Sequence, residues 1–260
     1  MQLNTFDLSG RTAVVTGGAG PLGSELSEVL ALAGARVVVV DLDPNRCAET
    51  VNALPGGGHV SIPVDLLESG GLSTVTDVVT ELGACDVLVN NAALTGTAGV
   101  SGYAVPFEQQ TDEAFTAALN LNLMVPFSLT RRLSPLLRAG RGSVINVSSI
   151  YGLVGPNLNL YQGTTMGNPA AYAASKGGVA QLTRYLATVL APEVRVNAFA
   201  PGGIARGQDD QFVTRYEQLT PLGRMATEGD FRGVVSWLAS AASAYVTGQV
   251  IAVDGGWTAW

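Results

Sequence analysis

Short runs of β-branched residues alternate along the chain with longer stretches in which apolar residues recur at helical spacing. The apolar runs, such as the four valines at 37–40, are continuous rather than alternating, which predicts strands buried on both faces. The expected strands are Thr12–Thr16, Arg36–Val40, His59–Val64, Asp86–Val89, Ser143–Val147, Arg195–Phe199 and Val250–Val253.

Helices are expected in the intervals between these strands. Strand–helix alternation with right-handed crossovers predicts one α/β domain over residues 1–260, with a doubly wound parallel sheet of the Rossmann type. The longest helix carries Pro126 and Pro135, so we expect a kink at the first and a break near the second. The expected helices are Pro21–Ala33, Pro44–Leu54, Leu72–Leu82, Asp112–Arg138, Ala170–Leu190 and Asp230–Ser240.

The composition indicates a folded protein, with 47% hydrophobic and 13% charged residues. A net charge of -7 without a long Lys/Arg run argues against nucleic acid or an anionic membrane as a partner. Cys47, Cys85 and His59 do not have the spacing of metal ligands, so we expect no metal. The first residues lack the apolar core of a signal peptide, and no apolar run is long enough to span a bilayer. We therefore expect a cytoplasmic protein.

A glycine-rich turn, Thr16–Gly23, follows the first expected strand and precedes a helix. Glycine lets the backbone approach a pyrophosphate at a helix N-terminus, where free N–H groups and the helix dipole favour an anion. Taken alone, the turn is also compatible with a tight connection that binds no ligand. Pro21 suits the first helical position, but it removes one backbone N–H donor from the expected cofactor site.

An acidic residue, Asp41, ends the second strand at the distance from the turn where a carboxylate binds the adenosine ribose hydroxyls. The carboxylate repels a 2′-phosphate, and the nearest basic residue, Arg46, lies inside the next helix. The sequence thus favours NAD over NADP. Asp41 could instead cap that helix, but Asp43 is better placed to do so.

A tyrosine and a lysine four positions apart, Tyr172 and Lys176, lie on one face of an expected helix. A nearby positive charge lowers the pKa of a phenol, so this pair predicts an acid–base group. Ser149 follows the fifth strand, and Asn122 lies in the preceding long helix.

Together these features resemble the short-chain dehydrogenase/reductase family, and the resemblance runs nearly end to end. The turn Thr16–Gly23 is similar to the glycine-rich motif of that family, and Asp65 to an aspartate that contacts adenine. Further similarities are Asn90–Ala93 after the fourth strand, Pro201–Gly202 after the sixth and Val253–Gly256 after the last.

The resemblance implies a role for each member of a tetrad. Tyr172 is the general acid in reduction and the base in oxidation. Ser149 hydrogen-bonds the substrate oxygen, Lys176 binds the nicotinamide ribose and lowers the pKa of Tyr172, and Asn122 holds a water in a proton relay. The residues expected to contact the dinucleotide are Gly17, Gly20, Pro21, Leu22, Gly23, Asp41, Asp65, Leu66, Asn91, Ala92, Tyr172, Lys176, Pro201, Gly202 and Ile204.

The interval between Ser149 and Tyr172 is longer than is usual in this family. The extra segment, about 156–169, is polar, and we expect it to line a pocket for a hydroxyl-rich ligand; a tolerated surface insertion is the alternative. With Pro156 and Arg215–Tyr216, it resembles a bacterial branch linked to nonulosonic-acid and flagellin-sugar biosynthesis.

Residues 204–222 are expected to form a lid that closes over the substrate. The lid region carries arginines that either meet an anionic substrate or pair with acidic neighbours. These arginines are Arg206, Arg215 and Arg224, and the expected neighbours are Asp209, Asp210 and Glu217.

We therefore expect an NAD(P)-dependent oxidoreductase that interconverts a secondary alcohol and a ketone, with a small, polar or sugar-like substrate. The family resemblance implies a homodimer or homotetramer, and Trp257 and Trp260 are candidates for either an interface or the core. A 3-oxoacyl thioester reductase is an alternative, against which the insert and Asp41 weigh. A non-catalytic nucleotide-binding scaffold is a second alternative, against which the complete tetrad weighs.

Overall fold

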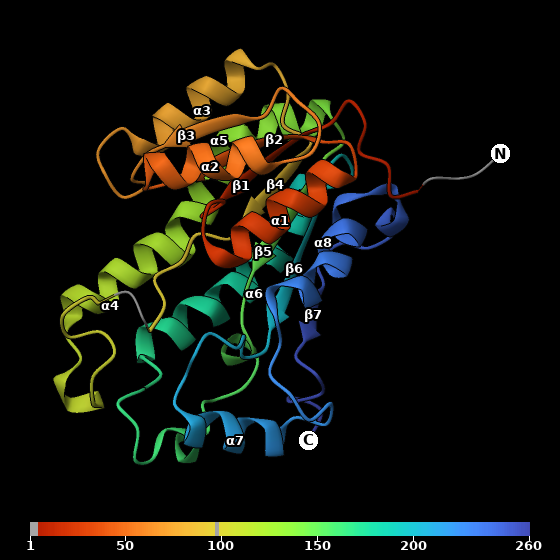
Figure 1. Ribbon diagram of the computed structural model, residues 1–260. Coiled ribbons are helices and arrows are strands. Elements are labelled where there is room, and N and C mark those ends of the chain that lie inside the picture. Colours follow the sequence, from red (N-terminus) through yellow and green to blue (C-terminus); the bar gives the residue numbers. More distant parts are fainter. Residues whose placement is uncertain (1–4, 97–98) are drawn as a thin grey trace.

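The computed structural model describes residues 5–96 and 99–260, and in them a parallel sheet is covered by helices on both faces (Figure 1). The strand order is β3-β2-β1-β4-β5-β6-β7, and every neighbouring pair is parallel. The winding direction changes between β1 and β4, which confirms the doubly wound Rossmann fold. The strands are β1 (Thr12–Thr16), β2 (Arg36–Asp41), β3 (Val60–Pro63), β4 (Val87–Asn90), β5 (Ser143–Val147), β6 (Arg195–Pro201) and β7 (Val250–Val253).

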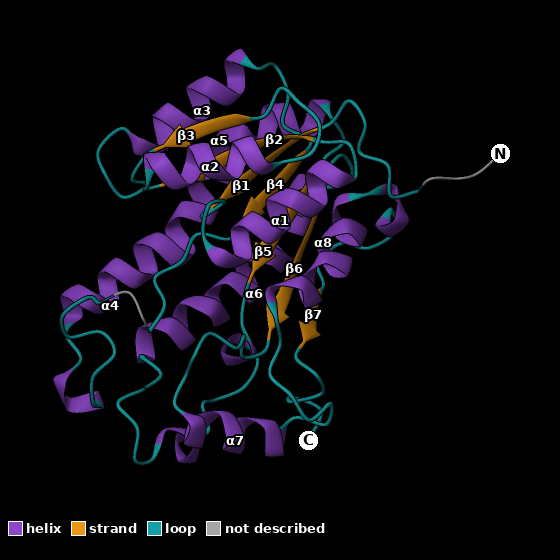
Figure 2. Cartoon of the chain, viewed as in Figure 1, coloured by secondary structure: helices purple, strands orange, loops and turns teal. Residues whose placement is uncertain are grey.

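Two apolar layers hold the helices to the sheet. The helices α1, α2 and α8 pack on one face, and α3, α5 and α6 pack on the other. The arrowheads of β5, β6 and β7 point toward the end of the molecule where α7 lies, so this end carries their carboxyl edge (Figure 2). The helices are α1 (Pro21–Leu32), α2 (Pro44–Ala53), α3 (Gly71–Glu81), α4 (Asp112–Leu119), α5 (Val125–Ala139), α6 (Ala170–Leu190), α7 (Asp210–Leu219) and α8 (Arg232–Ala239).

The strands differ in burial according to their place in the sheet. Every residue of β1, β4 and β5 is buried, as the continuous apolar runs predict. The edge strands β3 and β7 contain exposed positions, so the expectation of burial on both faces is wrong for them. An edge strand has a neighbour on one side only, and the helix layers cover it less completely.

The expected long helix Asp112–Arg138 is divided differently from the prediction. A π-helical turn, Asn120–Met124, separates α4 from α5, and Pro126 follows it in the first turn of α5, consistent with a kink there. The break near Pro135 is wrong, because Pro135 lies inside a continuous α5. A proline leaves the carbonyl four residues earlier without its N–H partner, and here the Ser134 hydroxyl donates to that carbonyl, on Arg131, at 2.9 Å.

Two elements near the carboxyl edge were not predicted. The expected lid contains α7, which begins after Asp209 and buries Phe212 and Tyr216, one helical turn apart. The Asp209 carboxylate accepts from the N–H of Gln211 at 2.8 Å and so caps this helix. The insert contains a short 3-10 helix, Leu158–Tyr161.

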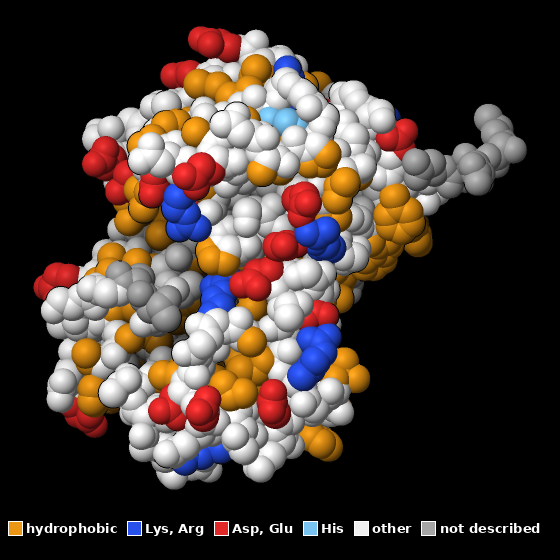
Figure 3. Space-filling view, in the orientation of Figure 1, with side chains coloured by type: hydrophobic (Ala, Val, Ile, Leu, Met, Phe, Trp, Pro, Cys, Tyr) orange, Lys and Arg blue, Asp and Glu red, His pale blue; other side chains and the backbone are white. Residues whose placement is uncertain are grey.

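Within the described residues, no helix has the length and apolar character needed to cross a membrane. The same residues contain no group of three or more His, Cys, Asp or Glu side chains arranged to hold a metal ion. Residues 1–4, part of the segment inspected for a signal peptide, lie outside the described residues. On the face shown in Figure 3, basic side chains stand beside acidic ones instead of gathering into one patch.

Candidate active site

The glycine-rich turn between β1 and α1 adopts a shape that depends on its glycines. Gly17 has φ +60, and a Cβ on Gly23 would lie 1.8 Å from the Gly17 carbonyl oxygen. Helix α1 begins after Gly20 with Pro21 in its first turn, without a side-chain cap or an acidic residue there. Its first N–H groups, including that of the buried Leu22, therefore remain suited to the phosphates of a dinucleotide.

The segment after β4 fixes this turn in place. The Asn91 side chain donates to the carbonyls of Thr16 and Gly17, both at 3.0 Å. In return, the Thr16 hydroxyl accepts from the N–H groups of Asn91 and Ala92 at 3.0 and 3.1 Å. A Cβ on Gly17 would lie 2.9 Å from Cα of Ala92, so the two segments are as close as a glycine allows.

Asp41 is joined to the turn and does not cap α2. Its carboxylate accepts from the N–H groups of Ala19 at 3.0 Å and Leu42 at 2.8 Å. Asp43 is the N-cap of α2, as the sequence predicts. Arg46 reaches back from α2 and donates to the Ala19 carbonyl at 2.6 Å. A positive charge thus lies closer to Asp41 and the turn than the sequence indicates.

The other expected cofactor contacts follow β3 and β6, at the same edge of the sheet. After β3, Asp65 accepts from the N–H of Leu67 at 2.7 Å, and Leu66 is buried. Pro201 ends β6, and the Gly202 N–H donates to the Val253 carbonyl at 3.0 Å. Ile204 follows and forms an isolated β-bridge with Ala226.

The structure brings Ser149, Tyr172 and Lys176 together. The Lys176 ammonium is buried, donates to the Val147 carbonyl at 2.7 Å and lies 5.7 Å from the centroid of the Tyr172 ring. Ser149 follows β5, and its hydroxyl hydrogen-bonds the Tyr172 side chain. One strand end and one helix face therefore converge on the Tyr172 phenol.

Asn122 lies in the π-helical turn, behind this group. Its side-chain amide accepts from the Leu94 N–H at 2.7 Å and donates to the Leu94 carbonyl at 3.2 Å. It also donates to the Ser175 hydroxyl at 3.0 Å, and that hydroxyl donates to the Tyr172 carbonyl. The amide thus ties the loop after β4 to α6.

Burial determines the direction of both pKa shifts in this group. It raises the pKa of the Tyr172 phenol above its usual value, although the hydrogen bond with Ser149 and the positive charge of Arg206 lower it. Burial lowers the pKa of Lys176 to about 8. The expected lowering of the Tyr172 pKa is therefore not produced by the side chains of the protein alone.

Three further tyrosines, Tyr103, Tyr151 and Tyr161, lie near Tyr172. A negative charge on the Tyr172 phenolate raises the pKa of each of them. Tyr103 donates to the Leu94 carbonyl at 3.0 Å, and the hydroxyls of Tyr151 and Tyr161 are 2.8 Å apart. Burial is the main cause that raises all three pKa values, so these hydroxyls are neutral. Tyr103 lies in the connection between β4 and α4, and Tyr151 and Tyr161 lie in the connection between β5 and α6. No local motif in the sequence identifies them.

The insert packs on the lid helix α7. Leu160 is buried in one cluster with Phe212, Tyr216 and Trp257, and the rings of Tyr161 and Phe212 are 5.3 Å apart. Trp257 is thus a core residue, whereas Trp260 is 80% exposed and donates to the Leu219 carbonyl. Arg215 adds polar contacts between the two segments, because it donates to the carbonyls of Asn159, Leu160 and Gln162.

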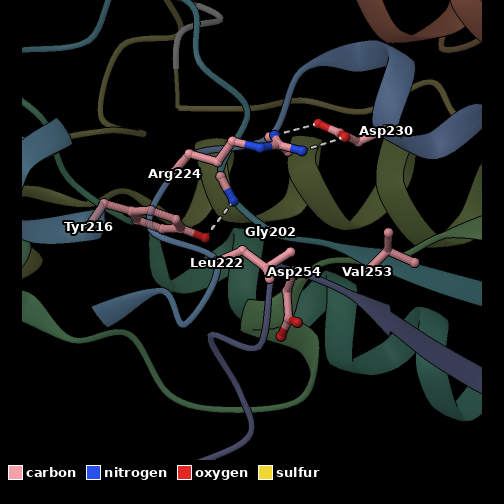
Figure 4. Close-up of a pocket in the computed structure, with 10 residues that line it drawn as sticks. Gly202, Tyr216, Leu222, Arg224, Asp230, Val253 and Asp254 are labelled. Carbon is pink, nitrogen blue, oxygen red and sulfur yellow. Dashed lines mark hydrogen bonds and ion pairs between the residues drawn. The ribbon is translucent and has the colours of Figure 1, made fainter. Parts of the chain in front are cut away.

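The lid arginines do not pair with the acidic neighbours that the sequence suggests. Arg206 pairs with Glu228 through Nε at 2.8 Å, and Arg215 binds the insert. Arg224 binds both carboxylate oxygens of Asp230 at 2.7 Å, beside a pocket of about 140 Å³ (Figure 4). The expected partners were wrong because residues 228–230, which follow the lid in the chain, fold back against it and supply the carboxylates instead.

Comparison with known proteins agrees with this geometry. Residues 17–258 match the family described as enoyl-(acyl carrier protein) reductase. A rhamnolipids biosynthesis 3-oxoacyl-[acyl-carrier-protein] reductase of Pseudomonas aeruginosa is 34% identical, over 96% of this chain and 97% of its own. A 2-dehydro-3-deoxy-D-gluconate 5-dehydrogenase of Escherichia coli is 33% identical over 100% of both chains.

Solved structures are similar over the same length. A short-chain dehydrogenase of Leptospira borgpetersenii with bound NAD+ is 30% identical with a TM-score of 0.85, covering 99% of this chain and 96% of its own. A gluconate 5-dehydrogenase of Burkholderia cenocepacia in complex with NADP and tartrate is 28% identical with a TM-score of 0.87, covering 100% of both.

The comparisons give no support to the nonulosonic-acid and flagellin-sugar branch that the insert suggested. They do support hydride transfer with either nicotinamide cofactor, because relatives of both kinds match over the full length. The matching relatives are dehydrogenases and reductases over the full length, which rules out the alternative of a non-catalytic nucleotide-binding scaffold. The chain belongs to the short-chain dehydrogenase/reductase family and is an NAD(P)-dependent oxidoreductase that acts on CH–OH groups.

Proposed function

We propose that this protein interconverts a secondary alcohol and a ketone at the site formed by Ser149, Tyr172 and Lys176, with a polar, hydroxyl-bearing substrate. The observation that carries the proposal is the convergence of these three side chains at the carboxyl edge of the sheet, beside the glycine-rich turn.

A bound nicotinamide supplies the acceptor or donor of the hydride. In oxidation, the Tyr172 phenolate takes the hydroxyl proton as the hydride leaves the same carbon; in reduction, the phenol returns a proton to the forming alkoxide. The Ser149 hydroxyl donates to that oxygen and stabilises its developing charge. Lys176 contributes a buried positive charge next to the phenol.

The positive charge of an oxidised nicotinamide, together with Lys176, supplies the lowering of the Tyr172 pKa that the buried phenol needs. We place Asn122 in this site as a positioning residue, because its amide is occupied by Leu94 and Ser175. A water held by Asn122 would then bind its backbone carbonyl instead of its side chain.

For the cofactor, we propose a preference for NAD over NADP. Asp41 supports it, since the carboxylate is held beside the turn where the adenosine ribose binds in this fold. Arg46 opposes it, because its guanidinium lies beside the same turn. We therefore expect a modest preference rather than exclusion of NADP. The dinucleotide would lie along Gly17–Gly23, Asp65–Leu66, Asn91–Ala92 and 201–204.

The substrate pocket is proposed to be bounded by the insert, about 156–169, and by the lid, about 204–222. The Tyr151 and Tyr161 hydroxyls support a substrate with several hydroxyl groups, because such a site leaves its own polar groups unpaired when an apolar analogue binds. Asn159 and Gln162, by contrast, bond to each other on the exposed side of the insert. Tyr161 is therefore the insert residue best placed to meet substrate.

A second candidate is a 3-oxoacyl thioester reductase, since a relative with that name matches the full chain. The Tyr151 and Tyr161 hydroxyls favour a hydrophilic substrate over an acyl chain. We also propose a cytoplasmic homo-oligomer in which the half-exposed edge strand β7 provides one contact.

The test is a dehydrogenase and reductase screen with polyols, sugar acids, simple alcohols and acetoacetyl-CoA, each with both cofactors, followed at the absorbance of the reduced nicotinamide. We expect turnover of hydroxyl-rich substrates, with higher kcat/KM for NAD(H). Preferred turnover of acetoacetyl-CoA would instead support the second candidate.

A further inference from the structure

Of the three arginines in the lid region, Arg206 has N–H donors that form no hydrogen bond with the described residues. Arg215 is engaged with insert carbonyls and Gln211, and Arg224 forms a two-pronged pair with Asp230. Arg206 uses Nε for Glu228. Among the described residues, neither of its two terminal nitrogens has a hydrogen-bond partner in the protein.

The backbone around Arg206 is held firmly at the carboxyl edge of the sheet. The Arg206 N–H donates to the Gln208 side chain at 2.7 Å, and that side chain donates to the Ile204 carbonyl at 2.6 Å. The N–H of Ala205 donates to the Ala226 carbonyl at 2.8 Å. The loop thus fixes where the guanidinium can reach.

The reacting group lies at the same edge. The strands β5 and β6 are adjacent and parallel, so Ser149, just past the end of β5, and the loop that carries Arg206, past the end of β6, leave the sheet side by side. In agreement with this placement, the Arg206 charge lowers the pKa of the Tyr172 phenol. Among the described residues, the Ser149 hydroxyl also lies beside the phenol, and the buried Lys176 ammonium donates to the Val147 carbonyl. Arg206 is therefore a positive group near the phenol whose terminal N–H groups remain available to a substrate anion.

The pairing with Glu228 decides which kind of anion fits. Both side chains are partly exposed, at 40% and 23%, so the pair holds Arg206 only weakly. A planar guanidinium with two free N–H groups matches a carboxylate in a two-pronged geometry. The doubly charged phosphate ester would be repelled more strongly by Glu228 than a carboxylate.

We propose that Arg206 binds a carboxylate of the substrate, so that the substrate is a hydroxy acid or the matching oxo acid. This inference rests on the proposed function, because Tyr172 defines the position of the reacting carbon. The carboxylate lies on another carbon of the same substrate. The tyrosine hydroxyls then meet the remaining hydroxyl groups of the same molecule.

The experiment compares tartrate with threitol, which has the same four carbons and two secondary hydroxyls but no carboxylate. Binding of each to the protein saturated with NAD+ is measured by calorimetry, for the wild type, Arg206→Gln, Arg206→Lys and Arg184→Gln. Arg184 lies on α6, and its side chain hydrogen-bonds to Ala180 and Gln181 of the same helix, so it is a matched control. Titration of NADH by fluorescence shows that each variant is folded and retains its cofactor site.

We expect tartrate to bind the wild type about tenfold or more tightly than threitol, as a charge-assisted hydrogen-bonded contact implies. Arg206→Gln should remove this difference, Arg206→Lys should retain part of it, and Arg184→Gln should leave it unchanged. Equal binding of tartrate and threitol to the wild type, or unchanged tartrate binding in Arg206→Gln, overturns the proposal. Inorganic phosphate that binds more tightly than tartrate overturns the choice of a carboxylate.

These outcomes do not depend on turnover. A protein that binds tartrate through Arg206 but reduces or oxidises no compound in the screen would contradict the proposed function and not the anion site. A protein that turns over neutral polyols and ignores tartrate would contradict the anion site and not the proposed function.

Discussion

The proposed cofactor side and the proposed substrate side of this site are built in different ways. On the cofactor side, the turn between β1 and α1 is shaped by glycines and held by short side chains that bond to backbone, such as Asn91 to Thr16. On the substrate side, the insert and α7 are held by packed rings and by Arg215, which reaches across more than fifty positions of sequence.

This difference shows how many kinds of residue each side of the site can accept. A turn that must approach a dinucleotide tolerates few residues, because a Cβ at Gly23 would collide with the Gly17 carbonyl. The substrate side needs only two segments that pack on each other, and rings such as Tyr161 and Phe212 allow many such pairs. On the proposed function, the cofactor side would therefore carry the common chemistry, and the substrate side would carry the selectivity.

The largest expected effect is at the phenol that both sides share. Tyr172→Phe should lower kcat by about 10²- to 10⁴-fold, the range for loss of a positioned acid–base group. NADH binding should change little, because Asp41 and the turn remain. Tyr185→Phe, on the exposed face of the same helix, is the control and should keep full activity. A Tyr172→Phe variant within about tenfold of the wild type would show that another group transfers the proton.

The pH dependence should differ between the two directions. Burial raises the pKa of Tyr172, and the charge of a bound oxidised nicotinamide opposes this shift, so we expect the phenolate needed for oxidation to form as the pH rises. The kcat/KM of oxidation should therefore rise about tenfold per pH unit below the phenol pKa, and that of reduction should stay flat there. Above about pH 8 the Lys176 charge is lost, and oxidation should level off. Oxidation that is independent of pH between about 6 and 8 would place the pKa of the phenol below that range.

A smaller effect is expected where the substrate side is tied together. Arg215→Gln removes charge-assisted hydrogen bonds to the insert and should raise KM for the preferred substrate about tenfold. The affinity for NAD(H) should stay the same, because none of these contacts reaches the turn. Arg132→Gln, on α5, is the control. An unchanged KM in Arg215→Gln would mean that the tether does not shape the pocket.

The smallest expected effect tests the cofactor side. Asp41→Ala should lower the NAD to NADP affinity ratio and Arg46→Ala should raise it, each about two- to fivefold, as suits partly exposed charges. Dissociation constants from NADH and NADPH fluorescence measure both. Shifts in the same direction for the two variants would contradict the opposed roles given to these residues.

The same contrast explains how far the sequence alone reaches. The β1–α1–β2 unit and α6 were predicted nearly to the residue, because glycines, Asp43 and the Tyr172–Lys176 pair act through local spacing. The helix α7 was not predicted, since its polar surface conceals two buried aromatic residues, Phe212 and Tyr216. Pro135 was misjudged because its compensation depends on one hydroxyl, that of Ser134.

Several features of the site depend on contacts between distant segments and have no signature in the chain. Tyr103, Tyr151 and Tyr161 meet Tyr172 only in the folded protein. The pairing of Arg206 with Glu228 likewise requires residues 228–231 to fold against the loop after β6. Sequence spacing predicted the groups to which we assign the common chemistry, and the structure adds the groups that lie around them.

The central claim is that hydride transfer and proton transfer occur at one carbon beside Tyr172. The most direct test supplies cofactor deuterated at the transferable position together with a panel of oxo acids and ketoses, and detects deuterium in the alcohol product by mass spectrometry. The account predicts one deuterium on the carbinol carbon with the wild type and a strongly reduced yield with Tyr172→Phe. Product without deuterium, or equal labelling by both proteins, would contradict it.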